Sequence, residues 1–161
     1  MSSPSAHNVA LGLGSNLNDR EALLKEAVER LQCENFLLNR CSAFLDTEPV
    51  DCIPGTPRFL NAVVTGIWGG PPETLFTTCK KIETGMGRPK NHSSSESRII
   101  DIDILLFGTQ AIKNNKLQIP HPRLKERLFI LEPLAEIAPE WRIPPDNVTV
   151  LEARDKLLMK S

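Results

Sequence analysis

The hydrophobic pattern along the chain alternates between runs typical of strands and repeats of helical spacing. In chain order it predicts a strand at about 8–15, a helix at about 19–32, strand runs within 36–46 and 58–68, a helix at about 72–86 and a strand within 97–108. A further helical stretch should end before Pro139, and Asn18 with Glu21 indicates a capping box for the first helix. The order predicts the α+β class, with a ferredoxin-like βαββαβ core and helices packed on an antiparallel or mixed sheet.

Length and composition favour one domain spanning 1–161, with its core at about 8–140. The chain is 40% hydrophobic and 24% charged, and no apolar run approaches the roughly 18 residues of a membrane span. The start lacks the features of an export signal, so we expect a cytoplasmic protein with no membrane partner. Four cysteines lack metal-ligand or redox spacing, and we expect them to be reduced and mostly buried.

The net charge of −1 hides a basic segment at 88–127, which contains eight Lys or Arg residues and four acidic residues. This surplus favours a compact polyanion, such as a nucleotide with its metal. Aromatic residues make up only 5% of the chain and Tyr is absent, so a nucleic-acid partner is not expected.

Two aspartates interrupt the apolar run SRIIDIDILLFG at 97–108. Because side chains alternate along a strand, Asp101 and Asp103 should share one face with Ile99 and Leu105. The opposite face should be core and carry Ile100, Ile102, Ile104 and Leu106. Two carboxylates so placed suit Mg²⁺, which prefers oxygen ligands and is commonly completed by substrate phosphates. The alternative is a solvated sheet face, with the aspartates paired to Arg98 or Arg127; the surrounding cations favour the metal site.

The segment GLGSN at 12–16 lies between a predicted strand and a predicted helix. Its backbone N–H groups could face an anion there, or the glycines could serve a tight turn. It matches neither the dinucleotide fingerprint nor the Walker loop, so phosphate binding is expected mainly from side chains and the metal.

Several motifs occur together and in order: LGLGSN (11–16), TEPV (47–50), FLNAV (59–63), R-x-x-D-x-D (98–103), LLFG (105–108) and IPHPRLKERLF (119–129). Together they resemble the 6-hydroxymethyl-7,8-dihydropterin pyrophosphokinase family of the folate pathway. The resemblance implies a ferredoxin-like fold and transfer of pyrophosphate from ATP to the pterin hydroxymethyl group, with release of AMP. It implies two Mg²⁺ ions as cofactors, ATP and the pterin as partners, and a monomer.

The resemblance also implies roles for individual residues. Asp101 and Asp103 would hold both ions, and Arg88 and Arg98 would act with them as catalytic residues. ATP would be bound by Lys90, Arg98, Ile104, Lys116, His121 and Arg127. The pterin would be bound by Thr47, Pro49, Val50, Phe59, Asn61 and Phe129, and Glu83 matches a family glutamate near the substrate.

The chain departs from the family pattern at Ser95, Glu96 and Ser97, where W-G-P usually precedes the arginine. The missing aromatic residue predicts weaker closure over the pterin. Two alternatives stay open: another magnesium-dependent phosphoryl or nucleotidyl transferase, which would release ADP or pyrophosphate, and a pterin- or nucleotide-binding module without turnover.

Overall fold

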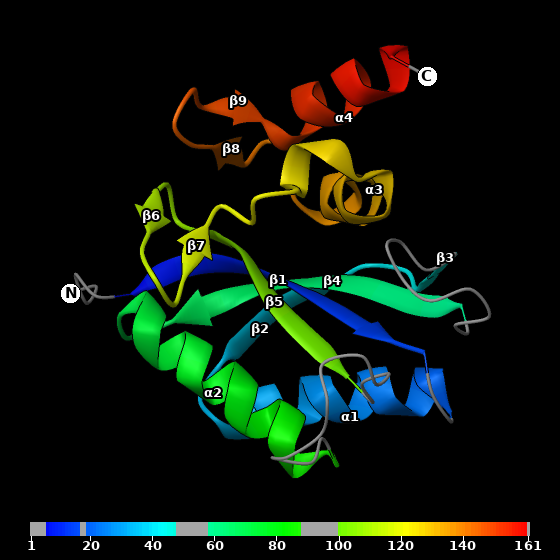
Figure 1. The fold of residues 1–161 in the computed structure, drawn as a ribbon, viewed down its shortest axis with the longest axis vertical. Coiled ribbons are helices and arrows are strands. Elements are labelled where there is room, and N and C mark those ends of the chain that lie inside the picture. The colour runs from blue at the N-terminus through cyan, green and yellow to red at the C-terminus, as the bar shows by residue number, and fades with distance from the viewer. Residues whose placement is uncertain (1–5, 17–18, 48–57, 88–99, 161) are drawn as a thin grey trace.

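A computed structural model describes residues 6–16, 19–47, 58–87 and 100–160 of the chain (Figure 1). Its strands are β1 (His7–Ser15), β2 (Leu37–Cys41), β3 (Leu45–Thr47), β4 (Phe59–Trp68), β5 (Asp101–Phe107), β6 (Ile112–Lys113), β7 (Gln118–Ile119), β8 (Arg142–Ile143) and β9 (Val148–Thr149). Its helices are α1 (Arg20–Cys33), α2 (Pro72–Gly85), the short 3₁₀ turn η1 (Leu124–Glu126), α3 (Leu128–Ile137) and α4 (Val150–Met159).

The central sheet has the strand order β2-β4-β1-β5, and β3 pairs with β4 as well. All of its pairings are antiparallel. With α1 following β1 and α2 following β4, this is the βαββαβ arrangement expected from the hydrophobic pattern. The α+β, ferredoxin-like prediction is therefore confirmed.

Helices cover both faces of this sheet (Figure 1). The helices α1 and α2 lie on one face, α3 packs on the other, and α4 packs on α3. The first core, under α1 and α2, includes Val9, Leu11, Leu13, Leu24, Leu75 and Ile102. The second core, under α3, includes Ala10, Val63, Leu105, Leu131 and Leu134. The sequence pattern indicated only the first of these two cores.

A β-bulge in β5 changes which face its last residues occupy. Asp101 to Ile104 pair in regular register with β1, but Leu11 pairs with Ile104 whereas Ala10 pairs with Leu106. The extra residue places both Leu105 and Leu106 in the second core. The prediction that Leu106 shares a face with Ile104 is therefore wrong, because strict alternation ends at the bulge.

Helix capping also differs from the prediction. The N-cap of α1 is Asp19, whose carboxylate accepts a hydrogen bond from the Ala22 amide at 3.1 Å, and not Asn18. A capping box does occur at α4, where Thr149 and Glu152 cap each other's amides. The hairpin of β8 and β9 and the helix α4 extend the fold beyond the core predicted at 8–140.

The cysteines follow the prediction only in part. Cys79 is buried, and burial together with the nearby Glu83 carboxylate raises the pKa of its thiol to about 12. Cys33 and Cys41 are exposed, which contradicts the expectation of mostly buried thiols, and Cys52 lies outside the described residues. No helix in the described part of the chain combines the length and apolar character needed to cross a membrane.

Candidate active site

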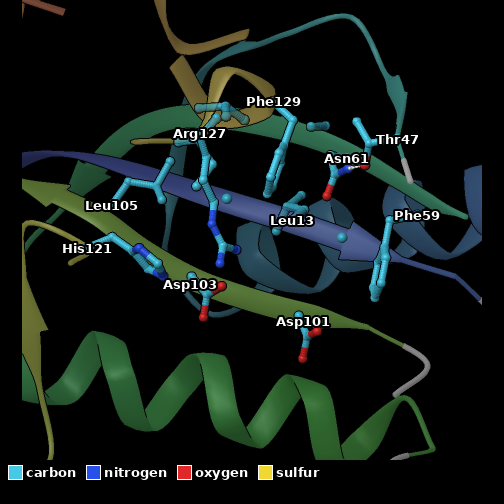
Figure 2. Close-up of a pocket in the computed structure, with 15 residues that line it drawn as sticks. Leu13, Thr47, Phe59, Asn61, Asp101, Asp103, Leu105, His121, Arg127 and Phe129 are labelled. Carbon is cyan, nitrogen blue, oxygen red and sulfur yellow. Dashed lines mark hydrogen bonds between the residues drawn. The ribbon is translucent and has the colours of Figure 1, made fainter. Parts of the chain in front are cut away.

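A cavity of about 260 Å³ opens between the sheet and the start of α3 (Figure 2). It is lined by Gly12, Leu13, Gly14, Thr47, Phe59, Asn61, Ala62, Val63, Asp101, Asp103, Leu105, His121, Arg127, Phe129 and Ile130. The lining residues come from five separate segments of the chain: β1, β3, β4, β5 and the stretch from His121 into α3. Only the fold brings these segments together.

Asp101 and Asp103 lie along the β5 side of the cavity (Figure 2). They share the sheet face predicted from strand alternation, and Ile102 between them points into the first core. Two carboxylates on one face of a strand supply the hard oxygen donors that Mg²⁺ prefers. The donor chemistry of this pair therefore fits the metal that the sequence resemblance implies.

The strand between the two aspartates is anchored from α2 by Glu83. This glutamate is only 1% exposed, and its Oε2 accepts a hydrogen bond from the Ile102 amide at 2.7 Å. Its Oε1 accepts a hydrogen bond from Lys80 Nζ at 3.2 Å. Because β5 lies at the edge of the sheet formed by the described residues, this backbone amide has no strand partner among them, and Glu83 satisfies it. Glu83 thus supports the aspartates from behind.

We expect Glu83→Ala to lower the free energy of unfolding by about 1–3 kcal/mol, because it leaves the buried Ile102 amide without an acceptor. Glu83→Gln keeps an acceptor and should lose less. Urea denaturation measures both values, and Glu73→Ala, an exposed position on α2, is the matched control. An equal loss in the control would contradict the role given to Glu83.

Cationic and polar groups face the aspartates from the segment before α3. Figure 2 shows Arg127 extending across the cavity toward Asp103, with His121 beside them. The Arg127 guanidinium also lies 5.5 Å from the Phe129 ring centroid, within the range of a cation–π contact. The cavity therefore combines two carboxylates with a guanidinium on its opposite wall.

His121 is held as a hydrogen-bond donor toward the cavity. Its Nδ1 accepts a hydrogen bond from the Arg123 amide at 3.1 Å, so the proton of the neutral ring resides on Nε2. Partial burial, then the charges of Arg127 and Arg123, lower the pKa of His121 below its usual value. The environment of His121 therefore favours the neutral ring.

This lowered pKa predicts a pH dependence of stability. The unfolded chain binds a proton at His121 more readily than the folded chain does, so the contribution of His121 to stability is present above about pH 6.5 and declines below it. Urea midpoints of the wild type and of His121→Gln at pH 7.5 and 5.5 test this. The wild type should lose more stability than the variant on acidification; parallel losses would contradict the assignment.

The other end of the cavity is aromatic and amide-rich. Phe59 and Phe129 present their rings on either side of Asn61 (Figure 2). The Asn61 Nδ2 donates a hydrogen bond to Thr47 Oγ1 at 2.6 Å, which fixes the orientation of the amide. This wall suits a flat heterocycle with polar edges.

Two glycines of β1 form the floor of the cavity, a role that the sequence analysis did not assign. Gly12 and Gly14 are strand residues paired with β4 and β5, so neither the anion-binding loop nor the tight turn considered for GLGSN is correct at these positions. A methyl group at Gly14 would lie 3.0 Å from Asn61 Oδ1 and 3.8 Å from Phe59 Cδ1. The sequence did carry one indication of this role: two glycines two positions apart within an apolar run share one face of a strand and leave that face open.

Gly14→Ala is expected to raise the KM for a heterocyclic substrate by roughly tenfold, because Asn61 must shift to relieve the contact. Steady-state kinetics measure this change. The KM for ATP, the second substrate that the sequence resemblance implies, serves as internal reference. Gly69→Ala is the control, since no atom of the described residues lies within 4 Å of a methyl group there. Unchanged kinetics in Gly14→Ala would contradict the proposed floor.

Some predicted site residues lie elsewhere. Ile104 is 6% exposed in the first core and does not line the cavity, so any contact of Ile104 with ATP would use its backbone. Lys116 is exposed in the turn between β6 and β7, also away from the cavity lining. The remaining predicted positions fall outside the described residues: Arg88, Lys90, Arg98, Pro49 and Val50.

The family model for 7,8-dihydro-6-hydroxymethylpterin-pyrophosphokinase matches residues 10–139. A Bacillus subtilis protein named 2-amino-4-hydroxy-6-hydroxymethyldihydropteridine pyrophosphokinase is 38% identical over 133 residues, covering 81% of this chain and 78% of its own. A Porphyromonas gingivalis protein of the same name is 38% identical over 139 residues, covering 84% and 93%.

Longer proteins are similar as well. A folate synthesis bifunctional protein of Arabidopsis thaliana is 38% identical over 87% of this chain, which spans 29% of that relative's length. Among solved structures, a Plasmodium falciparum HPPK-DHPS matches with a TM-score of 0.72 at 16% identity, over 96% of this chain and 46% of the other, which supports the fold alone. The family match and the two bacterial relatives show that this chain belongs to the 7,8-dihydro-6-hydroxymethylpterin-pyrophosphokinase family.

Proposed function

We propose that this chain transfers pyrophosphate from ATP to the hydroxymethyl group of 6-hydroxymethyl-7,8-dihydropterin and releases AMP, as a step of folate biosynthesis. The observation that carries the proposal is a single cavity that joins an aromatic and amide wall to a pair of aspartates and a guanidinium. Family membership supports the same reaction. The reaction requires both the aromatic end and the charged end of the cavity, because a flat heterocycle and a polyphosphate must be bound next to each other.

The pterin would occupy the wall formed by Phe59, Phe129 and Asn61. The two rings supply apolar faces for the bicycle, and the amide oxygen of Asn61, which its bond to Thr47 holds in place, accepts from the N–H groups of the pterin edge. The hydroxymethyl group would then extend toward Asp101 and Asp103, which line the same cavity. Pro49 and Val50 stay predicted contacts.

ATP would bind with its phosphates between the aspartates and the segment before α3. Arg127 would neutralise phosphate charge, and the Nε2–H of His121 would donate a hydrogen bond to a phosphate oxygen. Arg88, Lys90, Arg98, Ile104 and Lys116 stay predicted contacts from the sequence. The resulting arrangement provides positioning and charge neutralisation, which are the main requirements of phosphoryl transfer.

Asp101 and Asp103 would hold two Mg²⁺ ions, which when bound neutralise and align the phosphates. The pterin hydroxyl oxygen then forms a bond to the β-phosphorus as the bond from that phosphorus to the α–β bridging oxygen breaks. AMP retains the bridging oxygen, and the hydroxyl proton passes to solvent. The chain's own contribution is to keep the two substrates aligned.

The identity of the nucleotide product tests the proposal. Purified protein is incubated with ATP, magnesium and the pterin, and the nucleotides are separated by chromatography. AMP that forms only when pterin is present is the expected result. ADP would indicate a simple kinase, and binding without any product at high protein concentration would indicate a binding module; either would overturn the proposal.

A further inference from the structure

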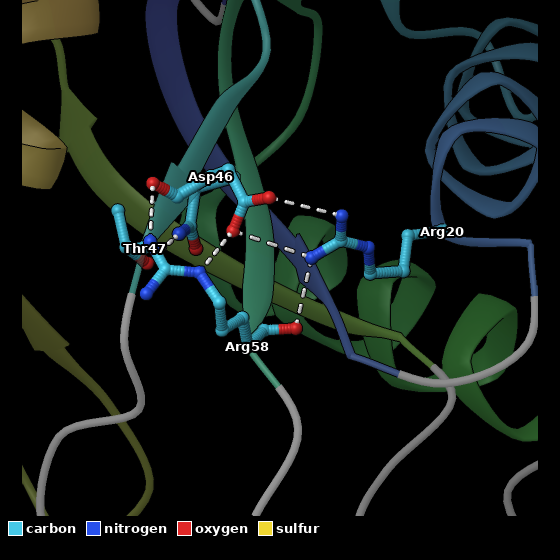
Figure 3. Close-up of polar contacts among 5 residues, drawn as sticks. Arg20, Asp46, Thr47 and Arg58 are labelled. Atoms are coloured by element: carbon cyan, nitrogen blue, oxygen red, sulfur yellow. Dashed lines mark hydrogen bonds and ion pairs between the residues drawn. The ribbon is translucent and has the colours of Figure 1, made fainter.

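Three charged side chains meet where β3, β4 and α1 approach one another, outside the cavity (Figure 3). Arg58 Nε donates to Asp46 Oδ1 at 2.9 Å, and Arg20 Nη2 donates to Asp46 Oδ2 at 3.1 Å. Arg20 Nη1 also donates to the Arg58 carbonyl oxygen at 3.0 Å. This Arg20–Asp46–Arg58 cluster joins the first residue of α1 to the middle of β3 and to the residue that precedes β4.

The cluster lies directly behind one wall of the cavity. In the pairing of β3 with β4, Thr47 is opposite Phe59, Leu45 is opposite Asn61, and Asp46 is opposite Leu60. Side chains alternate along a strand, so Asp46 points to the face opposite that of its neighbour Thr47. Thr47, Phe59 and Asn61 face the cavity, whereas the members of the cluster are not among the described residues that line it.

The residues just before β3 are anchored, since Phe44 packs against the first core and the Ala43 amide donates a hydrogen bond to Glu136 Oε2 at 3.1 Å. The strand β3 itself is short. It contains three residues, pairs only with β4 within the described residues, and its first two residues are exposed. Its own residues therefore contribute little of the apolar burial that usually fixes a strand. Two guanidinium groups on one carboxylate, which lower the pKa of Asp46 through their hydrogen bonds, keep that carboxylate ionised and held from two sides.

Global stability does not explain this arrangement. The side chains of Arg20 and Asp46 are 30% and 47% exposed, and exposed ion pairs contribute little to the free energy of unfolding. The contacts join residues 26 and 38 positions apart in the sequence, so they tie the start of α1 to β3 and to the residue before β4. The cavity residues next to these contacts in the chain are Thr47, which follows Asp46, and Phe59, which follows Arg58.

We propose that Arg20, Asp46 and Arg58 are positioning residues for the pterin site: they hold Thr47 and Phe59 in place and, through Thr47, orient the amide of Asn61. This inference rests on the proposed function, since it takes the pterin as the ligand of that wall. It assigns to an exposed charge cluster a role in substrate affinity, and no contact with either substrate.

Steady-state kinetics of Asp46→Asn and Arg20→Gln test the inference. We expect the KM for the pterin to rise about tenfold, because Asn61 and Phe59 are no longer held in one arrangement. The kcat and the KM for ATP should stay near wild-type values. Arg20→Lys keeps a charged donor for Asp46 and should restore most of the affinity. Arg30→Gln is the matched control, because Arg30 lies on the same helix and pairs with Glu26 at 2.8 Å, far from β3.

Direct binding of the pterin, measured by calorimetry together with thermal unfolding, separates the outcomes. A weaker affinity at an unchanged unfolding temperature supports a positioning role. A lower kcat, higher KM values for both substrates and a lower unfolding temperature, all to a similar extent, would show that the cluster is merely structural. Unchanged pterin affinity in an active variant would overturn this inference and leave the proposed function standing. A wild-type protein that neither binds the pterin nor releases AMP would overturn both the inference and the proposed function.

Discussion

Asp101→Ala and Asp103→Ala are each expected to reduce pterin-dependent AMP release by about 10³-fold or more, since each removes a carboxylate that would hold magnesium against the phosphates. The loss should appear mainly in kcat. Binding of the pterin should be nearly unchanged, because its wall lies at the other end of the cavity. Chromatographic product analysis and calorimetry with the pterin measure the two effects separately.

Asp146→Asn is the matched control for this experiment. Asp146 is exposed and paired with Lys125 Nζ at 2.9 Å, outside the cavity lining. Its replacement should leave turnover unchanged and cost little stability. Near wild-type turnover in both Asp101→Ala and Asp103→Ala would remove the basis for a metal site at β5.

Arg127→Ala should lower kcat/KM for ATP by roughly 10²-fold, because the guanidinium on the wall facing Asp103 supplies positive charge where phosphate charge gathers. Arg127→Lys keeps the charge but loses the planar fork of donors, so an intermediate loss is expected. The KM for the pterin should change less than that for ATP, although Arg127 also contacts the ring of Phe129.

The control for Arg127 is Arg123→Ala. Arg123 is exposed on the same segment, and its contact with His121 uses the backbone amide, which the substitution retains. We expect kcat/KM for ATP to change by no more than about twofold in Arg123→Ala, because solvent and salt screen an exposed charge. Equal losses in Arg123→Ala and Arg127→Ala would show that overall charge matters and that the position of Arg127 does not.

Much of the fold was predictable because periodicity is a local property. The alternation around Asp101 and Asp103 placed both on one face of a strand, and the helical repeats located α1 and α2 to within a few residues. The bulge at Leu105 was not predictable in this way, because it depends on how β5 pairs with β1. The position of Gly12 and Gly14 on the floor of the cavity was not predictable for a similar reason. The segment GLGSN is compatible with a strand or with a turn until the strands that pair with it are known.

The candidate site likewise has a part that was predictable from the sequence and a part that was not. Sequence motifs named Phe59, Asn61, Asp103, His121 and Arg127, all of which line one cavity. No motif indicated that Glu83 accepts the Ile102 amide, or that Arg20 and Arg58 converge on Asp46. These contacts join segments distant in the chain, and the residue types involved are common on any surface.

The sequence by itself thus determined the order and type of the main elements, the shared face of the two aspartates and the resemblance to one enzyme family, since each depends on residues close together in the chain. The tertiary structure alone decided the second core under α3, the single cavity that joins the aromatic wall to the aspartates, and the groups that hold those walls from behind. Such features depend on side-chain burial and hydrogen bonding between distant segments, and these arise only when the chain is packed.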